Sequence, residues 1–343
     1  MISLGGGTQQ VAEIRFTNQD RTNTINNGTL QTSLINGLGS GGNLGTVNLP
    51  DVSQLGTGLS VDIISGEGIT LSGVVTSTNF SNDGAGTVTL DNTSNSMSGT
   101  ATAQLGRINV NGPGALGSAT AIIGGGTFAF EMNTPSASNN YTNPIVGTGT
   151  GNLFVFNGGF NQKNGELGAI TLNDLSNITM DETGGNASRI DSITIPDLTV
   201  VGNATLHMLM DDDLNVTNGL MGSSGMFGDK LTLELNSDNG DLDLGAASMI
   251  DILEVLAGNG DGQVEVDVGL TLNQLIVHGM DVPAGIYATN DALLQGRFEG
   301  PGQVTVTGLE PPSTVPEPAS IAIWMLLALA CGGFGCSRIR RKR

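Results

Sequence analysis

Residues 84–90 read Gly-Ala-Gly-Thr-Val-Thr-Leu, two glycines followed by a stretch in which polar and apolar side chains alternate. Alternation with a period of two places one face of a strand on an apolar core and the other face in water. Related phrases occur as GTGLSV at 56–61, GTGNLFV at 149–155 and GPGQVTV at 300–306. The repetition predicts many short strands separated by glycine-rich turns.

The composition favours thin layers of structure over a thick core. Of 343 residues, 53 are glycine, and only 4% are aromatic, whereas an average protein has about 7% glycine. Aromatic side chains dominate the cores of most compact proteins, so their scarcity disfavours a large globular enzyme. A hydrophobic fraction of 38% disfavours disorder. The glycines have no three-residue period, which excludes collagen.

The fold class that these patterns predict is all-β, with a right-handed parallel β-helix, or solenoid, over residues 1–307. Its coils would take about 20–25 residues each. A β-sandwich is the alternative, because it also consists of short strands with polar turns. Ala246–Leu256 is the best candidate for a helix, since its apolar residues follow helical spacing, but a pair of strands fits it as well.

Charge is distributed unevenly along the chain. The formal net charge is −20, and all 32 acidic residues lie at or before Glu317, whereas five basic residues close the sequence. An acidic body repels nucleic acid and anionic membrane surfaces. We therefore expect no nucleic-acid partner.

The C-terminal region divides into three segments. Residues 308–320 form a linker with four prolines, which favour an extended chain. Residues 321–337 contain no charged residue and predict a transmembrane helix. Residues 338–343 form a basic tail that should stay in the cytoplasm and act as a membrane stop, by the positive-inside rule; its basic residues are Arg338, Arg340, Arg341, Lys342 and Arg343.

The first residues lack the basic start and apolar stretch of an export leader. Because the rest of the pattern indicates export, we expect the start of the sequence to be incomplete and a signal peptide to precede Met1.

The order of these segments resembles the PEP-CTERM sorting signal of exported bacterial proteins. The resemblance covers 314–343 and includes Val315-Pro-Glu-Pro-Ala319, the apolar segment with Trp324 and the arginine-rich end. It implies that Pro316, Glu317 and Pro318 are recognised by an exosortase-type membrane enzyme. The chain would be anchored transiently in the inner membrane and then reach the cell surface or extracellular matrix.

Parts of the body resemble the autotransporter-associated β-strand repeat. The resemblance rests on Asn111–Ser118, which contains Ala-Leu-Gly, and on Gly124–Phe130, which contains Gly-Gly-Thr. Val282–Tyr287 and Phe298–Gly302 are similar to the way such bodies end before a PEP-CTERM tail. The resemblance implies a right-handed β-helix of the passenger type.

Few residues suggest chemistry. His207 and His278 lie in strand-like stretches and are interpreted as structural, and no P-loop, nucleophile elbow or His-Glu-x-x-His motif is present. We therefore predict no catalytic residues. The weak candidates for a calcium site are Asp238, Asp241 and Asp243, because carboxylates beside flexible turns suit a hard cation. Solvated turns that keep the body soluble are the alternative.

These observations lead to a functional hypothesis. We expect a non-enzymatic, exported structural or adhesin-type protein of the cell surface or matrix, without a required cofactor. Its expected partners are the exosortase-type enzyme, the membrane through residues 321–337, and extracellular polysaccharide. The alternative is a carbohydrate-binding or polysaccharide-degrading β-helix, which would need carboxylates and a basic residue in one groove.

Overall fold

The structure is a computed structural model. It describes residues 2–3, 5–16, 23–26, 29–37, 47–48, 51–54, 56–131, 140–156, 164–182, 192–210, 213–225, 227–236, 240–256, 258 and 261–308. The chain divides into a compact unit, Met1–Thr307, and a second unit, Gly308–Arg343. All described residues except Gly308 belong to the first unit.

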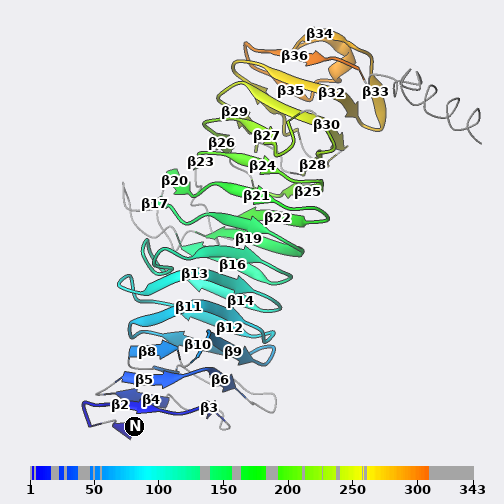
Figure 1. The fold of residues 1–343 in the computed structure, drawn as a ribbon. Coiled ribbons are helices and arrows are strands. Elements are labelled where there is room, and N and C mark those ends of the chain that lie inside the picture. The colour runs from blue at the N-terminus through cyan, green and yellow to red at the C-terminus, as the bar shows by residue number, and fades with distance from the viewer. Residues whose placement is uncertain are drawn as a thin grey trace, which may run out of the picture. The chain divides into compact units, whose positions relative to one another are not determined.

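The first unit is a parallel β-solenoid, as the sequence predicted (Figure 1). Successive coils stack in chain order, and a strand pairs in parallel with the strand one coil further on. Ile69 lies opposite Val88, for example, and Val88 lies opposite Ile108. The β-sandwich alternative is wrong, because its sheets are built from antiparallel neighbours.

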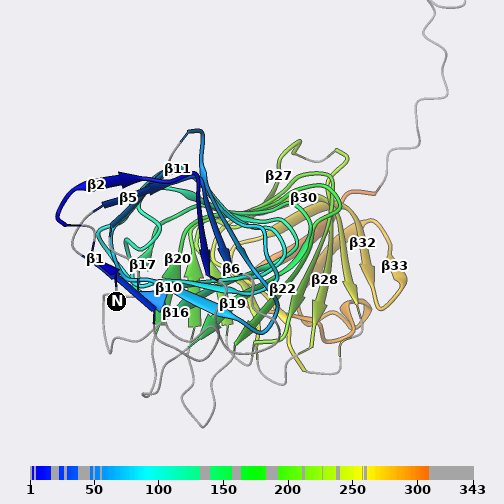
Figure 2. The ribbon, with the colours of Figure 1, turned by 90° about the horizontal axis from the view of Figure 1, so that it is seen from below.

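Each coil crosses up to three faces of the solenoid, and Figure 2 shows them along the stack, with β2 and β5 on the opposite side from β10 and β16. Ladder 1 consists of β1 (Ile2–Ser3), β4 (Asn23–Asn26), β7 (Val47–Asn48), β10 (Gly68–Leu71), β12 (Thr87–Leu90), β14 (Arg107–Val110), β16 (Thr127–Glu131), β19 (Thr150–Phe156), β22 (Asn177–Glu182), β25 (Asn203–Met208), β28 (Lys230–Leu235) and the second halves of β30 (Ser248–Leu256) and β32 (Leu270–Val277).

The second face has two parts. Ladder 2 consists of β2 (Thr8–Gln10), β5 (Thr29–Thr32), β8 (Asp51–Gln54) and the first halves of β11 (Val75–Asn82) and β13 (Ser96–Ala103). Further along the chain, its place between the other two ladders is taken by a seven-stranded sheet of β17 (Asn140–Tyr141), β20 (Asn164–Leu167), β23 (Ser192–Ile195), β26 (Asp213–Val216), β29 (Leu242–Leu244), β31 (Val264–Val266) and β35 (Phe298–Glu299).

Ladder 3 completes each coil. It consists of β3 (Glu13–Phe16), β6 (Leu34–Gly37), β9 (Leu59–Ile63), the second halves of β11 and β13, β15 (Thr120–Ile123), β18 (Ile145–Gly147), β21 (Ile170–Leu172), β24 (Leu198–Val200), β27 (Leu220–Gly222), the first halves of β30 and β32, and β36 (Gln303–Val306).

The core is a set of columns that follow the solenoid axis. Strands β10, β12 and β14 alternate half-buried and buried residues, so each contributes two side chains to the interior. The register stacks these side chains directly over their equivalents in the next coil, about 4.8 Å away. The longest such column on ladder 1 contains Ile69, Val88, Ile108, Phe128, Leu153, Met180, Met208 and Leu235, all buried. Thin layers therefore suffice, as the scarcity of aromatics indicated.

Three of the aromatic residues gather at one level of the interior. Phe128 stacks on Phe130 with 6.0 Å between ring centroids, and Phe130 meets Tyr141 edge to face at 5.1 Å. The Tyr141 hydroxyl donates to the carbonyl of Glu131 at 2.5 Å and accepts from the amide of Gly112 at 3.0 Å. Burial raises the pKa of Tyr141 well above its ordinary value. The phenol therefore stays neutral and closes the layer at the start of the seven-stranded sheet.

Glycines mark a corner where successive coils approach too closely for a side chain. A Cβ atom at Gly106 would lie 2.2 Å from the carbonyl oxygen of Gly86, and one at Gly126 would lie 2.2 Å from that of Gly106. Each of these glycines precedes a ladder-1 strand, so the contact repeats from coil to coil. The glycine-rich phrases found in the sequence are thus a requirement of stacking.

Of the two interpretations that the sequence left open for Ala246–Leu256, the helix is wrong and β structure is confirmed. These residues contribute β30, which pairs with β28 on one side and β32 on the other. The strand turns the corner between ladders 3 and 1, and Ile250 and Asp251 are both buried at that point. Two consecutive buried residues change the phase of the alternation, so the apolar residues fall at intervals that are also typical of a helix.

Antiparallel strands close the last coils. β33 (Met280–Val282) pairs with β32, and β34 (Gly285–Ala288) pairs with β36. One short 3₁₀ helix, Ala292–Leu294, is the helical element of the described chain. Because β34 pairs along β36, it occupies backbone groups that would otherwise form an open edge.

A methyl group at the glycine corner should separate two coils. We expect Gly106→Ala to lower the free energy of unfolding by about 1–3 kcal/mol or more, because the new atom would lie 2.2 and 2.3 Å from the backbone carbonyl oxygens of Gly86 and Gly84. Gly245→Ala is the control, since its Cβ would meet its nearest atoms at an ordinary 3.6 Å. Urea denaturation of both variants measures the effect. Equal stability of the two would contradict the role of the corner.

Candidate functional site

The predicted sorting signal lies outside the described residues. This holds for Pro316, Glu317 and Pro318, for the predicted transmembrane helix at 321–337 and for the basic tail at 338–343. Within the ranges that the structure describes, no helix has the length and apolar character needed to cross a membrane. These parts of the hypothesis therefore stay predictions.

Two of the three calcium candidates lie in or beside the seven-stranded sheet. Asp243 is in β29 and Asp241 immediately precedes it, whereas Asp238 is outside the described residues. Asp243 lies opposite Asn215 on one side and Glu265 on the other, and Glu265 lies opposite Glu299. Asp241 and Asp243 therefore belong to a sheet face rather than to the solvated turn that the sequence suggested. We call this face, with Asp213, Asp241, Asp243, Glu265, Asp267 and Glu299, the acidic face.

Burial, together with crowding on the acidic face, raises the pKa of three carboxyl groups. Burial is the main reason why the pKa of Asp243 is raised, and the charges of Asp267 and Asp213 add to it. The pKa of Glu265 is raised by burial and then by four neighbouring carboxylates. Burial also raises the pKa of Asp241, against the hydrogen bond that it accepts from the Gln263 amide at 2.6 Å. Proton binding relieves this repulsion.

The acidic face does not form a metal site in the described part of the chain. No group of three or more His, Cys, Asp or Glu side chains is arranged there, or elsewhere among those residues, to hold a metal ion. One oxygen of Asp241 is already occupied by the Gln263 amide. One oxygen of Asp243 is buried without a hydrogen-bond partner, which adds to the cost of keeping that carboxylate charged.

Two ion pairs lie on the outer face of ladder 1. His207 Nδ1 is 2.5 Å from Glu234 Oε2, and Lys230 Nζ is 2.7 Å from Glu254 Oε2. Hydrogen bonding from Asn236 is the main cause that lowers the pKa of Glu234, and His207 contributes further. A carboxyl group held in its ionised form is a poor general acid. Because β25 and β28 are neighbouring strands of ladder 1, the contact between His207 and Glu234 joins two successive coils.

His278 lies at the closed end of the solenoid. It occupies the turn between β32 and β33 with a φ of 50°, and its Nε2 accepts a hydrogen bond from Arg297 Nε at 2.9 Å. Arg297 also donates to the carbonyl of Gly262 at 2.9 Å. The two side chains tie the antiparallel cap to the coil beneath it.

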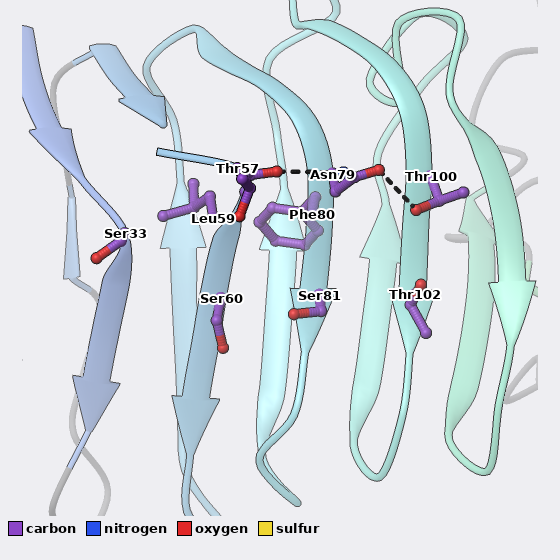
Figure 3. Close-up of a pocket in the computed structure, with 10 residues that line it drawn as sticks. Ser33, Thr57, Leu59, Ser60, Asn79, Phe80, Ser81, Thr100 and Thr102 are labelled. Carbon is purple, nitrogen blue, oxygen red and sulfur yellow. Dashed lines mark hydrogen bonds between the residues drawn. The ribbon is translucent and has the colours of Figure 1, made fainter. Parts of the chain in front are cut away.

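A polar groove lies at the corner between ladders 2 and 3 (Figure 3). Its volume is about 430 Å³. The buried side chains of Leu59 and Phe80 underlie it, and none of its lining residues is charged. The lining residues are Ser33, Thr57, Gly58, Leu59, Ser60, Asn79, Phe80, Ser81, Thr100 and Thr102. We call it the first corner groove.

The register aligns the hydroxyl groups of this groove in a row. Ser60, Ser81 and Thr102 are Cα partners on β9, β11 and β13, so the row runs across the strands and along the solenoid axis (Figure 3). Neighbours in such a row are about 4.8 Å apart. Next to the groove, the register of β11 against β13 shifts by one residue between Ser77 and Asn79, where β13 has the extra residue.

Hydrogen bonds hold the polar groups of the groove in place. The hydroxyls of Ser60 and Ser81 both donate to Asp83 Oδ2, at 2.5 and 3.0 Å. Asn79 donates to the carbonyl of Thr57 at 3.1 Å and accepts from the Thr100 hydroxyl at 3.2 Å. The serine oxygens therefore offer acceptor positions to a ligand, because their protons are already engaged.

A second groove follows the same corner further along the chain. Thr142, Pro144, Gly168, Ala169, Pro196 and Thr217 line it from the links between the seven-stranded sheet and ladder 3, and Asn140, Glu166, Leu167 and Thr194 line it from that sheet. Its volume is about 510 Å³. Both grooves thus lie where the chain passes from the second face of a coil to ladder 3.

Searches for similar proteins found no matching family model, no matching curated protein and no matching solved structure. The resemblances to the PEP-CTERM signal and to the autotransporter-associated repeat therefore rest on the sequence motifs alone.

The corner grooves were not predicted from the sequence. Ser60, Ser81 and Thr102 are the polar positions of ordinary alternating stretches, and nothing in their local sequence distinguishes them from other serines and threonines.

Mild acid should stabilise the acidic face. The folded state holds protons at pH values where the unfolded chain, with carboxyl pKa values near 4, has lost them. The folded state therefore gains most stability at pH values below the ordinary carboxyl pKa. This gain is lost as the pH rises through the raised pKa of the folded state. We expect the double variant Asp243→Asn, Glu265→Gln to raise the melting temperature at pH 7 by about 1–3 °C and to gain less than wild type on acidification.

Melting curves between pH 7 and pH 4 provide the measurement. Asp62→Asn, on β9 in ladder 3, is the matched control. A double variant that melts below wild type at pH 7, with an unchanged pH dependence, would show that repulsion on the acidic face is unimportant.

Proposed function

We propose that this chain is a non-enzymatic, exported bacterial protein that acts at the cell surface or in the extracellular matrix as a spacer or adhesin. Three parallel faces of hydrogen-bonded strands, stacked coil on coil, support this proposal most directly. Such a scaffold presents long rows of equivalent side chains, and its stability adds up from one coil to the next.

The sequence motifs support the route outside the cell. The Pro316-Glu317-Pro318 motif, the apolar segment 321–337 and the basic residues from Arg338 to Arg343 stand in the order of a PEP-CTERM signal. An exosortase-type enzyme of the inner membrane is the proposed partner. The four prolines of the linker favour an extended chain, which would present its backbone to such an enzyme.

The body fits the proposed passenger-like, right-handed β-helix. Within the stretch that resembles the autotransporter-associated repeat, Ala115 and Leu116 are buried in a turn and Gly126 leads into β16. The resembling phrases thus supply a corner and a strand of one coil. This supports the proposal that the repeat similarity reflects a shared way of forming coils.

Polysaccharide degradation has less support. The first corner groove is lined by no charged residue, and the second is lined by one carboxylate, Glu166. On ladder 1 Glu254 is paired with Lys230 and Glu234 contacts His207, and the pKa of Glu234 is lowered. Glycoside hydrolysis requires two carboxyl groups around one bound sugar, one of them with a raised pKa. The carboxyl groups of the acidic face with raised pKa values, Asp241, Asp243 and Glu265, line neither groove.

Expression in hosts with and without an exosortase tests the proposed route. We expect the wild-type protein to lose the segment after its PEP motif only when the enzyme is present. Glu317→Ala should prevent this cleavage, because it removes the only charge of the recognition motif. Intact mass and cell fractionation provide the readout.

Glu310→Ala is the control for that experiment, since it removes a carboxylate from the same linker outside the motif. It should be cleaved as wild type is. If wild type keeps its C-terminal segment in both hosts, the sorting hypothesis is wrong. Glycan cleavage by the purified protein would instead favour the enzymatic alternative.

A further inference from the structure

We propose that the first corner groove is a binding site for a linear, uncharged polysaccharide that lies along the solenoid axis. The proposal rests on the proposed function, because export would bring the groove into contact with polysaccharides outside the cell. It adds a ligand class and a set of contact residues to that function.

The shape of the groove selects a linear ligand. Ser60, Ser81 and Thr102 repeat the same position on three neighbouring strands, and Ser33 extends the lining toward β6 (Figure 3). Equivalent groups therefore recur at a constant spacing of about 4.8 Å. A polymer with repeating units can contact such a row several times, whereas a compact ligand can contact only part of it.

The hydrogen-bonding groups of the groove select hydroxyls. The hydroxyls of Ser60 and Ser81 both donate hydrogen bonds to Asp83, so their oxygens are left to accept hydrogen bonds from a ligand. The Thr102 hydroxyl, in contrast, has no hydrogen-bond partner among the residues that the structure describes and can donate or accept. A sugar hydroxyl both donates and accepts, so it can satisfy the two kinds of group side by side.

The electrostatics of the groove select an uncharged ligand. Asp83 lies beside it and no basic residue lines it. The net charge of the whole chain is −20, so a polyanion would be repelled. A cationic peptide would seek a carboxylate within the groove, but the nearby Asp83 oxygen Oδ2 is already engaged by two serine hydroxyls. An uncharged polyol needs neither charge nor counter-ion.

The groups are also positioned before a ligand arrives. Asn79 links Thr57 on the preceding coil to Thr100 on the following coil through two hydrogen bonds. Gly58 lies so close to the Asn79 carbonyl that a Cβ atom would be 3.0 Å from it. Little side-chain freedom is therefore lost on binding, which favours affinity.

Affinity electrophoresis of the full-length chain in mild detergent tests the proposal. Native gels would contain hydroxyethyl cellulose or dextran as neutral polymers, or polygalacturonate as a polyanion. We expect at least one neutral polymer, and not polygalacturonate, to retard the wild-type protein. The variant Thr102→Val and the double variant Ser60→Ala, Ser81→Ala should each weaken the interaction by about three- to tenfold.

The matched control is Thr171→Val, a half-buried threonine on β21 of the same ladder that lies outside both corner grooves. It should be retarded as wild type is, and thermal melting should show that all variants are folded. The proposal is overturned if neither neutral polymer retards the wild type, if the groove variants bind as the control does, or if polygalacturonate binds more strongly.

A polylysine peptide added as competitor tests whether the groove binds cationic peptides instead of a neutral polysaccharide. Binding of the peptide without binding of a neutral polymer would make the groove a site for cationic peptides and overturn the proposal. These outcomes do not depend on cleavage after the PEP motif, so failure of the sorting hypothesis and failure of the groove are distinguishable.

Discussion

The stacking of one coil directly on the next is the constraint on which this structure depends. In a parallel ladder, each strand pairs its backbone groups with the coil before it and the coil after it. The spacing of about 4.8 Å that this imposes leaves no room for a side chain where two corners meet. Gly106 and Gly126 stand at such a corner because their Cβ positions are taken by the carbonyl oxygen of the coil below.

The same stacking governs how polar groups are buried. Turn carbonyls at the corners would lose hydration without a partner, and buried asparagines supply it. Asn82 donates to the carbonyls of Gly86 and Arg107, Asn95 donates to that of Ala115, and Asn143 donates to those of Gly117 and Ala119. Asparagine thus serves here as a bridge between coils, in addition to its ordinary use in turns.

Stacking also determines the character of each outer face, because equivalent side chains of successive coils become neighbours. Where the repeated position is a carboxylate, as at Asp243 and Glu265, burial and then repulsion between neighbouring carboxylates raise the pKa of both groups. Where it is a hydroxyl, as at Ser60, Ser81 and Thr102, a neutral polar row results. One scaffold therefore offers a charged face that repels anions and an uncharged corner suited to hydroxyl-rich ligands.

The sequence by itself determined the class of fold and the inward-facing residues. Alternation at Thr87–Leu90 predicted that Val88 and Leu90 face the core, and both are fully buried. This is possible because the period of a strand is a local property. The pattern could not choose between helix and strand at Ala246–Leu256, where a strand turns a corner and changes the side that it buries.

Only the tertiary structure decided which residues become neighbours across coils. Partners lie 20 residues apart at Asn111 and Asp91 but 28 apart at Leu220 and Ser248, so no fixed period places them. Register is set by hydrogen bonding between whole strands, and a slip of one residue would turn every side chain to the other face. For this reason the acidic face and the corner grooves emerged only when the coils were stacked.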